Sequence, residues 1–366
     1  MTTSELLYLL ALQRIPNIGD ISAKKLLRTM GSAEAIFNAS KNELKAIDGI
    51  GNFKLKDLHN PDYLHQAESE LKFIKDNAIE IRYFEDAEYP EKLKHCIDAP
   101  ILLFQQGNIN LQQKKLISIV GTRKATNQGI AFCENLIEKL APLNPVIISG
   151  FAYGIDICAH KAALKHNLQT LGCLAHGLNQ IYPKSHAKYV DEVKNYGGFM
   201  TDFWSSATFD RNNFLRRNRI IAGLSQATLV IESAEKGGSL VTADIANSYN
   251  REVFAVPGRT TDAFSKGCNN LIKSQQAHML TCPEDLIYML NWDLKKQPKK
   301  PQPQLFVNLT EDEEKVLKAL QQKGKAELDD ISLIVKMPTY KIAPLLLNLE
   351  LNGLVRPLPG KMYEVI

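Results

Sequence analysis

The hydrophobic pattern in the middle of the chain alternates between short continuous apolar runs and longer segments with helical spacing. The runs are Leu116–Val120, Val146–Ile148, Thr170–Leu174, Ala227–Ile231 and Glu252–Val256. Runs of this length are typical of strands buried on both faces, and strands that alternate with helices indicate βαβ units. The pattern therefore predicts an α/β fold with a Rossmann-like, mainly parallel sheet as its core.

Residues 1–80 have helical spacing throughout and predict a separate helical domain. Two similar turns, Ile15–Gly19 and Ile47–Gly51, lie about 32 residues apart and resemble helix-hairpin-helix turns. In such turns glycines let the backbone bend tightly and point helix N-terminal amides outward, where a phosphate could bind. A small helical bundle with glycine turns explains the pattern equally well, and the net acidic charge of this part of the chain favours the bundle.

The C-terminal part predicts a linker over residues 292–307 and a winged-helix domain over 308–366. The linker is rich in Lys and Pro, which leaves it no means of packing. After it we expect helices at Glu311–Gln322, Leu328–Val335 and Tyr340–Asn352, followed by two short strands around Pro359-Gly360. The third helix offers few donors for base edges, so the domain is expected to bind protein rather than DNA. Residues 81–291 would then form the extended Rossmann-like domain.

Charge and composition narrow the class of protein only when they are taken region by region. The 366 residues carry a formal net charge of +4, but residues 114–291 hold 19 Lys and Arg against 14 Asp and Glu, a net +5. The six cysteines show no metal-ligand or redox spacing, and no apolar run is long enough to cross a membrane. We expect a cytoplasmic protein that needs neither metal nor cofactor and does not bind membranes.

Several loops at the predicted carboxyl edge of the sheet have the composition of anion-binding sites. Gly121, Thr122, Arg123 and Lys124 follow the first strand and are expected at a helix N-terminus, Gly150 follows the second strand, and Lys184 follows the third. Clefts at this edge are where open α/β sheets bind ligands. The first loop lacks the second glycine of a dinucleotide-binding motif, and the second strand lacks the acid that holds a ribose, so a nicotinamide cofactor is disfavoured.

Two further segments add arginines and a glycine turn. Arg211, Arg216, Arg217 and Arg219 crowd one helical stretch near Phe214, which suggests a groove that follows phosphates beside a stacking ring. Arg216 and Arg219, three positions apart, are expected to share one face of this helix. Gly237, Gly238 and Ser239 open the helix after the fourth strand. Asp156 and His160 would share a helix face, and we interpret them as structural because no nucleophile lies beside them.

Together these motifs resemble those of the bacterial DNA-processing protein A (DprA, also called Smf) family. The resemblance rests on residues 120–123, 149–156 with Ala159-His160, 182–184, 217–224 and 236–243 through Pro257-Gly258. It covers residues 115–290 specifically. The flanks fit the family's sterile-alpha-motif-like N-terminal domain and its C-terminal winged helix more loosely. Asp202-Phe203-Trp204 departs from the family pattern, which leaves the role of that loop open.

The resemblance implies a non-enzymatic protein that binds single-stranded DNA during natural transformation, protects it, and helps to load the RecA recombinase. It also implies a homodimer formed through the Rossmann-like domain. The DNA-binding residues expected from the loops and the resemblance together are Gly121, Thr122, Arg123, Gly150, Lys184, Arg211, Arg216, Arg217, Arg219, Gly237, Gly238 and Ser239.

Two functions from other classes stay open. A nucleotide phosphoribohydrolase on a lysine-decarboxylase-like Rossmann fold has a similar glycine turn, but it needs a glutamate just after that turn. Here Leu240–Ala243 follow, and the next carboxylate is Asp244. A winged-helix transcription regulator would need a basic recognition helix, which the C-terminal part lacks.

Overall fold

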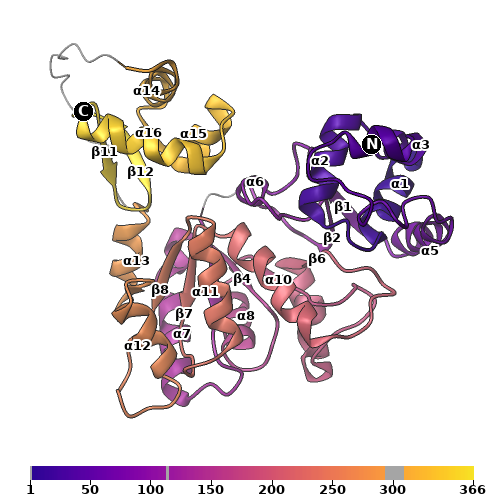
Figure 1. Cartoon of the computed structure of the whole chain (residues 1–366). Coiled ribbons are helices and arrows are strands. Elements are labelled where there is room, and N and C mark those ends of the chain that lie inside the picture. Colours follow the sequence, from indigo (N-terminus) through magenta and orange to yellow (C-terminus); the bar gives the residue numbers. More distant parts are fainter. Residues whose placement is uncertain (1, 113–114, 293–308) are drawn as a thin grey trace.

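The computed structural model describes residues 2–112, 115–292 and 309–366, so most of the expected linker lies outside the described residues. Its central feature is a nine-stranded sheet with the strand order β1-β2-β6-β5-β4-β3-β7-β8-β9 (Figure 1). The strands from β6 to β9 are parallel, whereas β2 pairs antiparallel with both β1 and β6. The predicted mainly parallel sheet is therefore confirmed. The strands are β1 (Glu80–Tyr83), β2 (Leu102–Gly107), β3 (Leu116–Val120), β4 (Val146–Ser149), β5 (Thr170–Cys173), β6 (Gly197–Thr201), β7 (Ala227–Val230), β8 (Glu252–Ala255) and β9 (His278–Met279).

Helices cover both faces of this sheet, and the alternation of side chains along β3 shows how. Ile117 and Ile119 pack with α7 (Asn127–Leu140), α8 (Ile155–Lys165) and α13 (Pro283–Met289). Leu116 and Val120 point to the opposite face, where they share a core with α10 (Arg211–Leu224) and α11 (Gly238–Ser248). Shorter elements complete the layers: α6 (Glu91–Lys94), η1 (Ala141–Leu143), η2 (Lys184–Tyr189), α9 (Val190–Asn195) and α12 (Lys266–Lys273).

The N-terminal part is helical, as predicted, and lies beside β1, β2 and α10 (Figure 1). Leu9 and Leu12 of the first helix, with Leu26 and Ile36, are fully buried in a core that continues onto the α10 face of the sheet. Continuous burial of apolar surface fixes these helices against the sheet. The helices are α1 (Thr3–Arg14), α2 (Asp20–Met30), α3 (Ala33–Asn38), α4 (Lys41–Lys45) and α5 (Asp62–Asp76).

The C-terminal part has its own core and a winged-helix arrangement. Helices α14 (Glu311–Lys323), α15 (Leu328–Val335) and α16 (Thr339–Leu351) agree with the predicted ones to within a residue at each end. The predicted terminal strands are present as β11 (Val355–Leu358) and β12 (Met362–Val365), and a short strand missed by the sequence, β10 (Lys325–Glu327), pairs with β12.

This winged helix contacts the sheet at the edge where the parallel strands begin. Arg251, directly before β8, forms a buried ion pair with Asp329. Glu327 accepts hydrogen bonds from Lys92 (2.8 Å) and from Gln226 (2.7 Å), which lies directly before β7. The carboxyl ends of the same strands, where the anion-binding loops are predicted, therefore lie at the opposite edge and stay clear of the winged helix.

Candidate nucleic-acid interface

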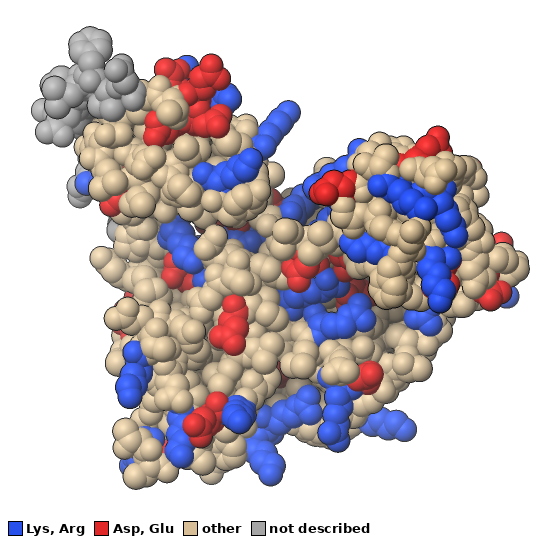
Figure 2. Space-filling view, in the orientation of Figure 1, with Lys and Arg blue, Asp and Glu red and all other residues tan. Residues whose placement is uncertain are grey.

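A groove with a volume of about 750 Å³ lies at the carboxyl edge of the sheet. It brings together loops that are far apart in the sequence, because parallel strands end on the same side. Eight of the predicted residues line it: Gly121, Thr122, Arg123, Arg211, Arg217, Gly237, Gly238 and Ser239. Figure 2 shows Lys and Arg side chains projecting along the corresponding lower edge of the molecule, whereas acidic side chains gather at the start of α14.

The first loop is held close to its neighbours by backbone contacts that exclude side chains. The amide of Thr122 donates to the carbonyl of Glu232 (2.8 Å), and the carbonyl of Thr122 accepts from the amide of Ile155 (3.2 Å). A Cβ on Gly154, which has a φ of +77°, would lie 2.1 Å from the Thr122 oxygen. A glycine is therefore required at this position.

One detail of the sequence interpretation is wrong in this loop. We expected Gly121 to Lys124 to lie at a helix N-terminus, but α7 begins only at Asn127. Its first amides are already occupied, since the hydroxyl of Thr126 accepts from Gly129 and the carboxylate of Glu232 accepts from the amide and hydroxyl of Thr126. The carboxylate takes the place that an anionic ligand would need.

The N-terminus of α11 is open instead. Gly237 is its N-cap and offers no side chain to cap the first amides, and both Gly238 and Ser239 line the groove. The Ser239 hydroxyl donates to Ser233 (2.9 Å), which holds the turn from inside. Uncapped amides at the start of an 11-residue helix carry partial positive charge towards the groove.

Three cations at the groove have no protein partner within the described ranges. Arg123, Arg211 and Lys236 are exposed, and no carboxylate or carbonyl of the described chain accepts a hydrogen bond from any of them. The guanidinium of Arg123 lies over the ring of Phe214, 5.1 Å from its centroid. These side chains keep their donors available for a ligand.

An aromatic cluster lies among these cations. The ring of Tyr182 lies 4.8 Å from that of Phe209 and 5.9 Å from that of Phe214 between centroids. Tyr182 is 38% exposed and Phe209 is 51% exposed, although aromatic rings normally avoid water. Phe214 is expected here from the sequence, whereas Phe209 comes to lie beside Tyr182 only through the folded loop.

Arg217 lies beneath the groove rather than on its surface. It is 4% exposed and donates to the carbonyls of Gly150 and Cys173, so its donors are committed inside the protein. Burial lowers the pKa of Arg217, and the nearby Asp156 partly offsets this effect. A Cβ at Gly150 would lie 2.5 Å from that guanidinium, so a side chain at this position would displace it.

Asp156 and His160, which the sequence placed on one helix face, both lie on α8 and are buried. The Asp156 carboxylate accepts from the amide of Ala152 (3.4 Å), and burial raises its pKa against the opposing charge of Arg217. The ring of His160 bonds to the Thr170 hydroxyl (2.7 Å). Each has its own partner, so the two residues do not form a catalytic pair with one another.

Four predicted residues lie outside the groove lining: Gly150, described above, and Lys184, Arg216 and Arg219. Lys184 is exposed and begins η2, two residues after Tyr182. Arg219 is clamped between Asp20 (2.8 Å) and Asp202 (2.5 Å); burial opposes its charge, but the two carboxylates raise its pKa. Arg216 lies over the ring of Phe203, 5.1 Å from its centroid, in a second cleft beside the N-terminal helices. The helix therefore turns its arginines towards different neighbours.

The described residues contain no group of three or more His, Cys, Asp or Glu side chains placed to hold a metal ion. None of the helices in the described ranges is both long enough and apolar enough to cross a bilayer.

Family models match two parts of the chain. Residues 80–291 match the family model of the DNA recombination-mediator protein A, and residues 297–361 match that of the DprA winged helix domain. Protein Smf of Escherichia coli is 34% identical over 276 residues, which cover 74% of each chain. The DNA processing protein DprA of Streptococcus pneumoniae is 36% identical over 199 residues, which cover 54% of this chain and 70% of the relative.

Two solved structures are similar as well. That of DNA processing protein A from Streptococcus pneumoniae has a TM-score of 0.63 at 28% identity and covers 78% of this chain and 97% of its own. That of DNA processing protein A from Helicobacter pylori, described for its single-stranded DNA binding mode, has a TM-score of 0.54 at 27% identity and covers 59% of this chain and 97% of its own. With the family model matched over more than half of its length, the chain belongs to the DNA recombination-mediator protein A (DprA/Smf) family.

Proposed function

We propose that this protein binds single-stranded DNA in the groove at the carboxyl edge of the sheet and performs no chemistry on it. The observation that carries the proposal is a set of three cations without a partner among the described residues, Arg123, Arg211 and Lys236, around exposed aromatic rings. Unpaired bases stack on such rings while the phosphates contact the cations, and duplex DNA cannot offer its base faces in this way. The single-stranded DNA described for the Helicobacter pylori relative supports the same ligand.

We infer that Gly121, Thr122, Gly237, Gly238 and Ser239 shape the groove, because they line it and two of them leave the α11 amides uncapped. Gly150 and Arg217 support it from below, and Lys184 contacts DNA beside Tyr182, next to the lining. Arg219 has no role in DNA binding in this proposal, since two carboxylates already neutralise it.

The proposal extends to the role expected from the family: protection of incoming DNA during natural transformation and competence, in the cytoplasm, with transfer of the strand to the RecA recombinase. Homodimer formation through the Rossmann-like domain also belongs to it. One feature that supports a dimer is β9, the last strand of the sheet, where Met279 is 51% exposed; an edge strand can pair with another chain. Size-exclusion chromatography with light scattering measures the mass of the protein in solution and so tests for the dimer. The growth of RecA filaments on a single strand that this protein already covers, compared with growth on the free strand, measures transfer.

Fluorescence anisotropy with labelled oligo-dT and with a duplex of equal length tests the central proposal at several salt concentrations. We expect tighter binding of the single strand. Arg123→Ala and Arg211→Ala should each weaken binding and flatten the plot of log K against log salt by about 0.7, the share of one phosphate contact. Lys165→Ala is the matched control, because Lys165 is exposed at the opposite end of α8. Equal affinity for the duplex, or variants that bind like the parent, would contradict the proposal.

Incubation with nucleoside monophosphates tests the enzymatic alternative. Asp156 is the one carboxylate among the groove-lining residues of the described chain, and it is buried and hydrogen-bonded to a backbone amide. We expect no release of free base. Release that disappears in Asp156→Asn would instead establish a phosphoribohydrolase-like reaction.

A further inference from the structure

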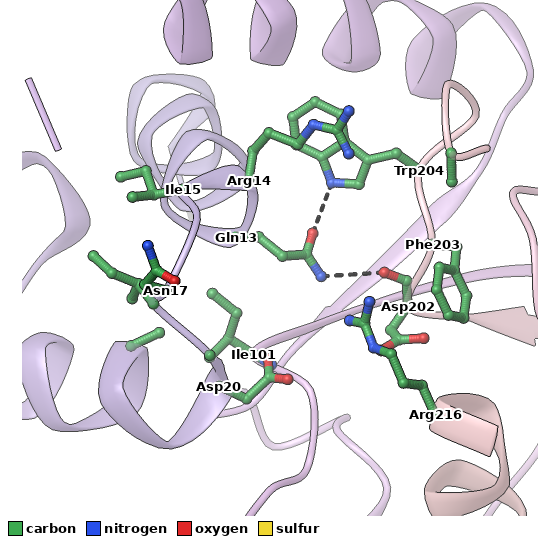
Figure 3. A pocket seen from close by; sticks show the side chains of 14 residues that line it. Gln13, Arg14, Ile15, Asn17, Asp20, Ile101, Asp202, Phe203, Trp204 and Arg216 are labelled. Atoms are coloured by element: carbon green, nitrogen blue, oxygen red, sulfur yellow. Dashed lines mark hydrogen bonds between the residues drawn. The ribbon is translucent and has the colours of Figure 1, made fainter. Parts of the chain in front are cut away.

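A second cleft lies between the N-terminal helices and the segment that leads from β6 into α10. Its volume is about 460 Å³, within the usual range of ligand sites. One wall is the turn between α1 and α2, which includes the first of the two glycine turns noted in the sequence. The other wall contains Phe203, Trp204 and Arg216 (Figure 3). The proposed function of the groove does not use this cleft.

Buried aromatic rings hold two exposed arginines in the cleft. The guanidinium of Arg14 lies over the ring of Trp204, 5.6 Å from its centroid, and Arg216 lies over Phe203 at 5.1 Å. Trp204 and Phe203 are only 4% and 7% exposed, so the surfaces under the guanidinium groups are fixed. A cation over a ring gains attraction without using its hydrogen-bond donors.

Hydrogen bonds hold the aromatic wall itself. The indole of Trp204 donates to the side-chain oxygen of Gln13 (2.8 Å), and the amide nitrogen of Gln13 donates to the carbonyl of Asp202 (3.4 Å). Figure 3 shows these bonds linking α1 to the loop after β6. The two walls therefore come from different parts of the chain but are joined into one rigid surface.

The donors of both arginines remain available. Arg14 uses only its Nε, which donates to Gln66 (3.1 Å), and within the described ranges no protein group accepts from its Nη atoms or from Arg216. The acidic residues of the cleft lie deeper: Asp202 is 6% exposed, and both Asp202 and Asp20 are bound to Arg219. Because Arg219 pairs with both of these carboxylates from behind the cleft, the charges left without an ion-pair partner in the described chain are those of Arg14 and Arg216.

The cleft and the groove lie on two sides of the same short segment. Ala207 and Arg216 line the cleft, while Phe209 and Leu215 line the groove. Phe209 and Leu215 are 51% and 45% exposed, so the segment between the two sites presents open apolar side chains beside the exposed polar residues Asp210 and Asn212. A strand bound in the groove could cross this surface with its bases against it, since bases stack on or contact apolar side chains.

We propose that the cleft is a second phosphodiester-binding site, in which Arg14 and Arg216 hold the backbone of a single strand that continues from the groove onto the N-terminal helices. This proposal rests on the proposed function of the groove and extends its path. It makes the glycine turn at Ile15–Gly19 part of a DNA-binding surface, although the N-terminal region as a whole is acidic.

Oligonucleotide length separates the two sites. We expect Arg14→Ala to leave the affinity for an oligo-dT of about six nucleotides unchanged and to weaken that for about thirty nucleotides by roughly three- to tenfold, with a salt slope flatter by about 0.7. Arg28→Ala is the matched control, because Arg28 is also exposed over a buried ring, Phe84, in the same helical region but outside the cleft. A thermal melt confirms that each variant is folded.

Trp204 supplies a direct readout of the cleft. In a Trp292→Phe background Trp204 is the remaining tryptophan, since the sequence has two. We expect the long oligonucleotide to change its emission and the short one to leave it unchanged. Thymidine monophosphate at millimolar concentration should also leave it unchanged; an equal response would assign the cleft to a free nucleotide and overturn the proposal.

The outcomes keep the two proposals apart. If the parent binds no oligonucleotide, or Arg123→Ala has no effect, the proposed function fails. If the parent binds and Arg123→Ala weakens binding, but Arg14→Ala and Arg216→Ala match Arg28→Ala at both lengths, only the second site fails.

Discussion

Arg217→Ala should destabilise the protein rather than merely remove a DNA contact. The guanidinium donates to the carbonyl of Gly150, directly after β4, to that of Cys173, the last residue of the neighbouring β5, and to the side chain of Asn218. Alanine would leave both carbonyls without this donor. It would also leave the buried Asp156 without the nearby positive charge that opposes the rise of its pKa.

The magnitude follows from these losses. A hydrogen bond to a charged group contributes about 1.5–3 kcal/mol, and removal of one member of a buried charge pair costs about 3–5 kcal/mol. We expect a loss of about 3–5 kcal/mol in the free energy of unfolding, which lowers the melting temperature of a domain of this size by on the order of 10 °C.

Thermal melts without DNA, followed by circular dichroism, measure the effect. Arg211→Ala is the matched control, since Arg211 is exposed on the same helix and lines the same groove. It should melt like the parent and still bind DNA more weakly. The reasoning is refuted if Arg217→Ala melts with the parent and behaves like Arg211→Ala, because Arg217 would then be a surface contact.

Gly154, His160 and Asp329 each make a contact whose loss can be measured. Gly154→Ala should lower the melting temperature and weaken oligo-dT binding, because its Cβ would meet the Thr122 carbonyl, whereas Gly238→Ala, with no atom within 4 Å of its Cβ, should melt like the parent. Burial holds the pKa of His160 at about 3, below the value of about 6.5 in the unfolded chain, so the unfolded state binds more protons in acid. The contribution of neutral His160 to the free energy of unfolding is therefore fully present above about pH 6.5 and is lost as the pH drops towards 3. In urea titrations the free energy of unfolding of the parent should fall by about 2 kcal/mol relative to that of His160→Gln between pH 7.5 and 5. Equal falls in the two proteins would contradict this. Asp329→Ala leaves Arg251 buried without its carboxylate partner, so the winged helix should be released from the sheet. Limited proteolysis should then separate the winged helix faster than in the parent. The affinity for oligo-dT should stay unchanged, because the groove lies at the other edge of the sheet.

The sequence predicts the buried parallel strands well because each is a continuous apolar run. Strands β3, β4, β5, β7 and β8 agree with the predicted ones to within a residue at each end. It misses β6, which begins with Gly197 and Gly198. Both glycines are required, since a Cβ at either position would lie within 2.3 Å of a carbonyl oxygen on a neighbouring strand, and this close pairing is visible only in the folded sheet.

The sequence also predicts that Arg216 and Arg219 share a helix face, and the structure confirms it. Both side chains turn towards the N-terminal helices, where Arg216 lines the cleft and Arg219 bonds to Asp20. Which partner that face meets depends on residues about 200 positions earlier, so no local pattern could separate these arginines from Arg211. Helical rotation of about 100° per residue puts Arg217 on a different side again, against the strand ends.

Net charge is therefore a poor measure of how much nucleic acid this domain can hold. Arg217, Arg219 and Arg251 contribute to the positive balance of residues 114–291, yet carbonyls or carboxylates of the protein already occupy their guanidinium groups. Arg123, Arg211 and Arg216 have the same charge but keep their donors unpartnered within the described chain. A cation that already forms a saturated ion pair within the protein must break that pair before it can bind a phosphate. Such a cation therefore contributes little to DNA binding. Binding capacity thus depends on which arginines the fold leaves unsatisfied, and Arg123, Arg211 and Arg216, which have no partner in the described part of the chain, lie in the groove and the cleft, on either side of the start of α10.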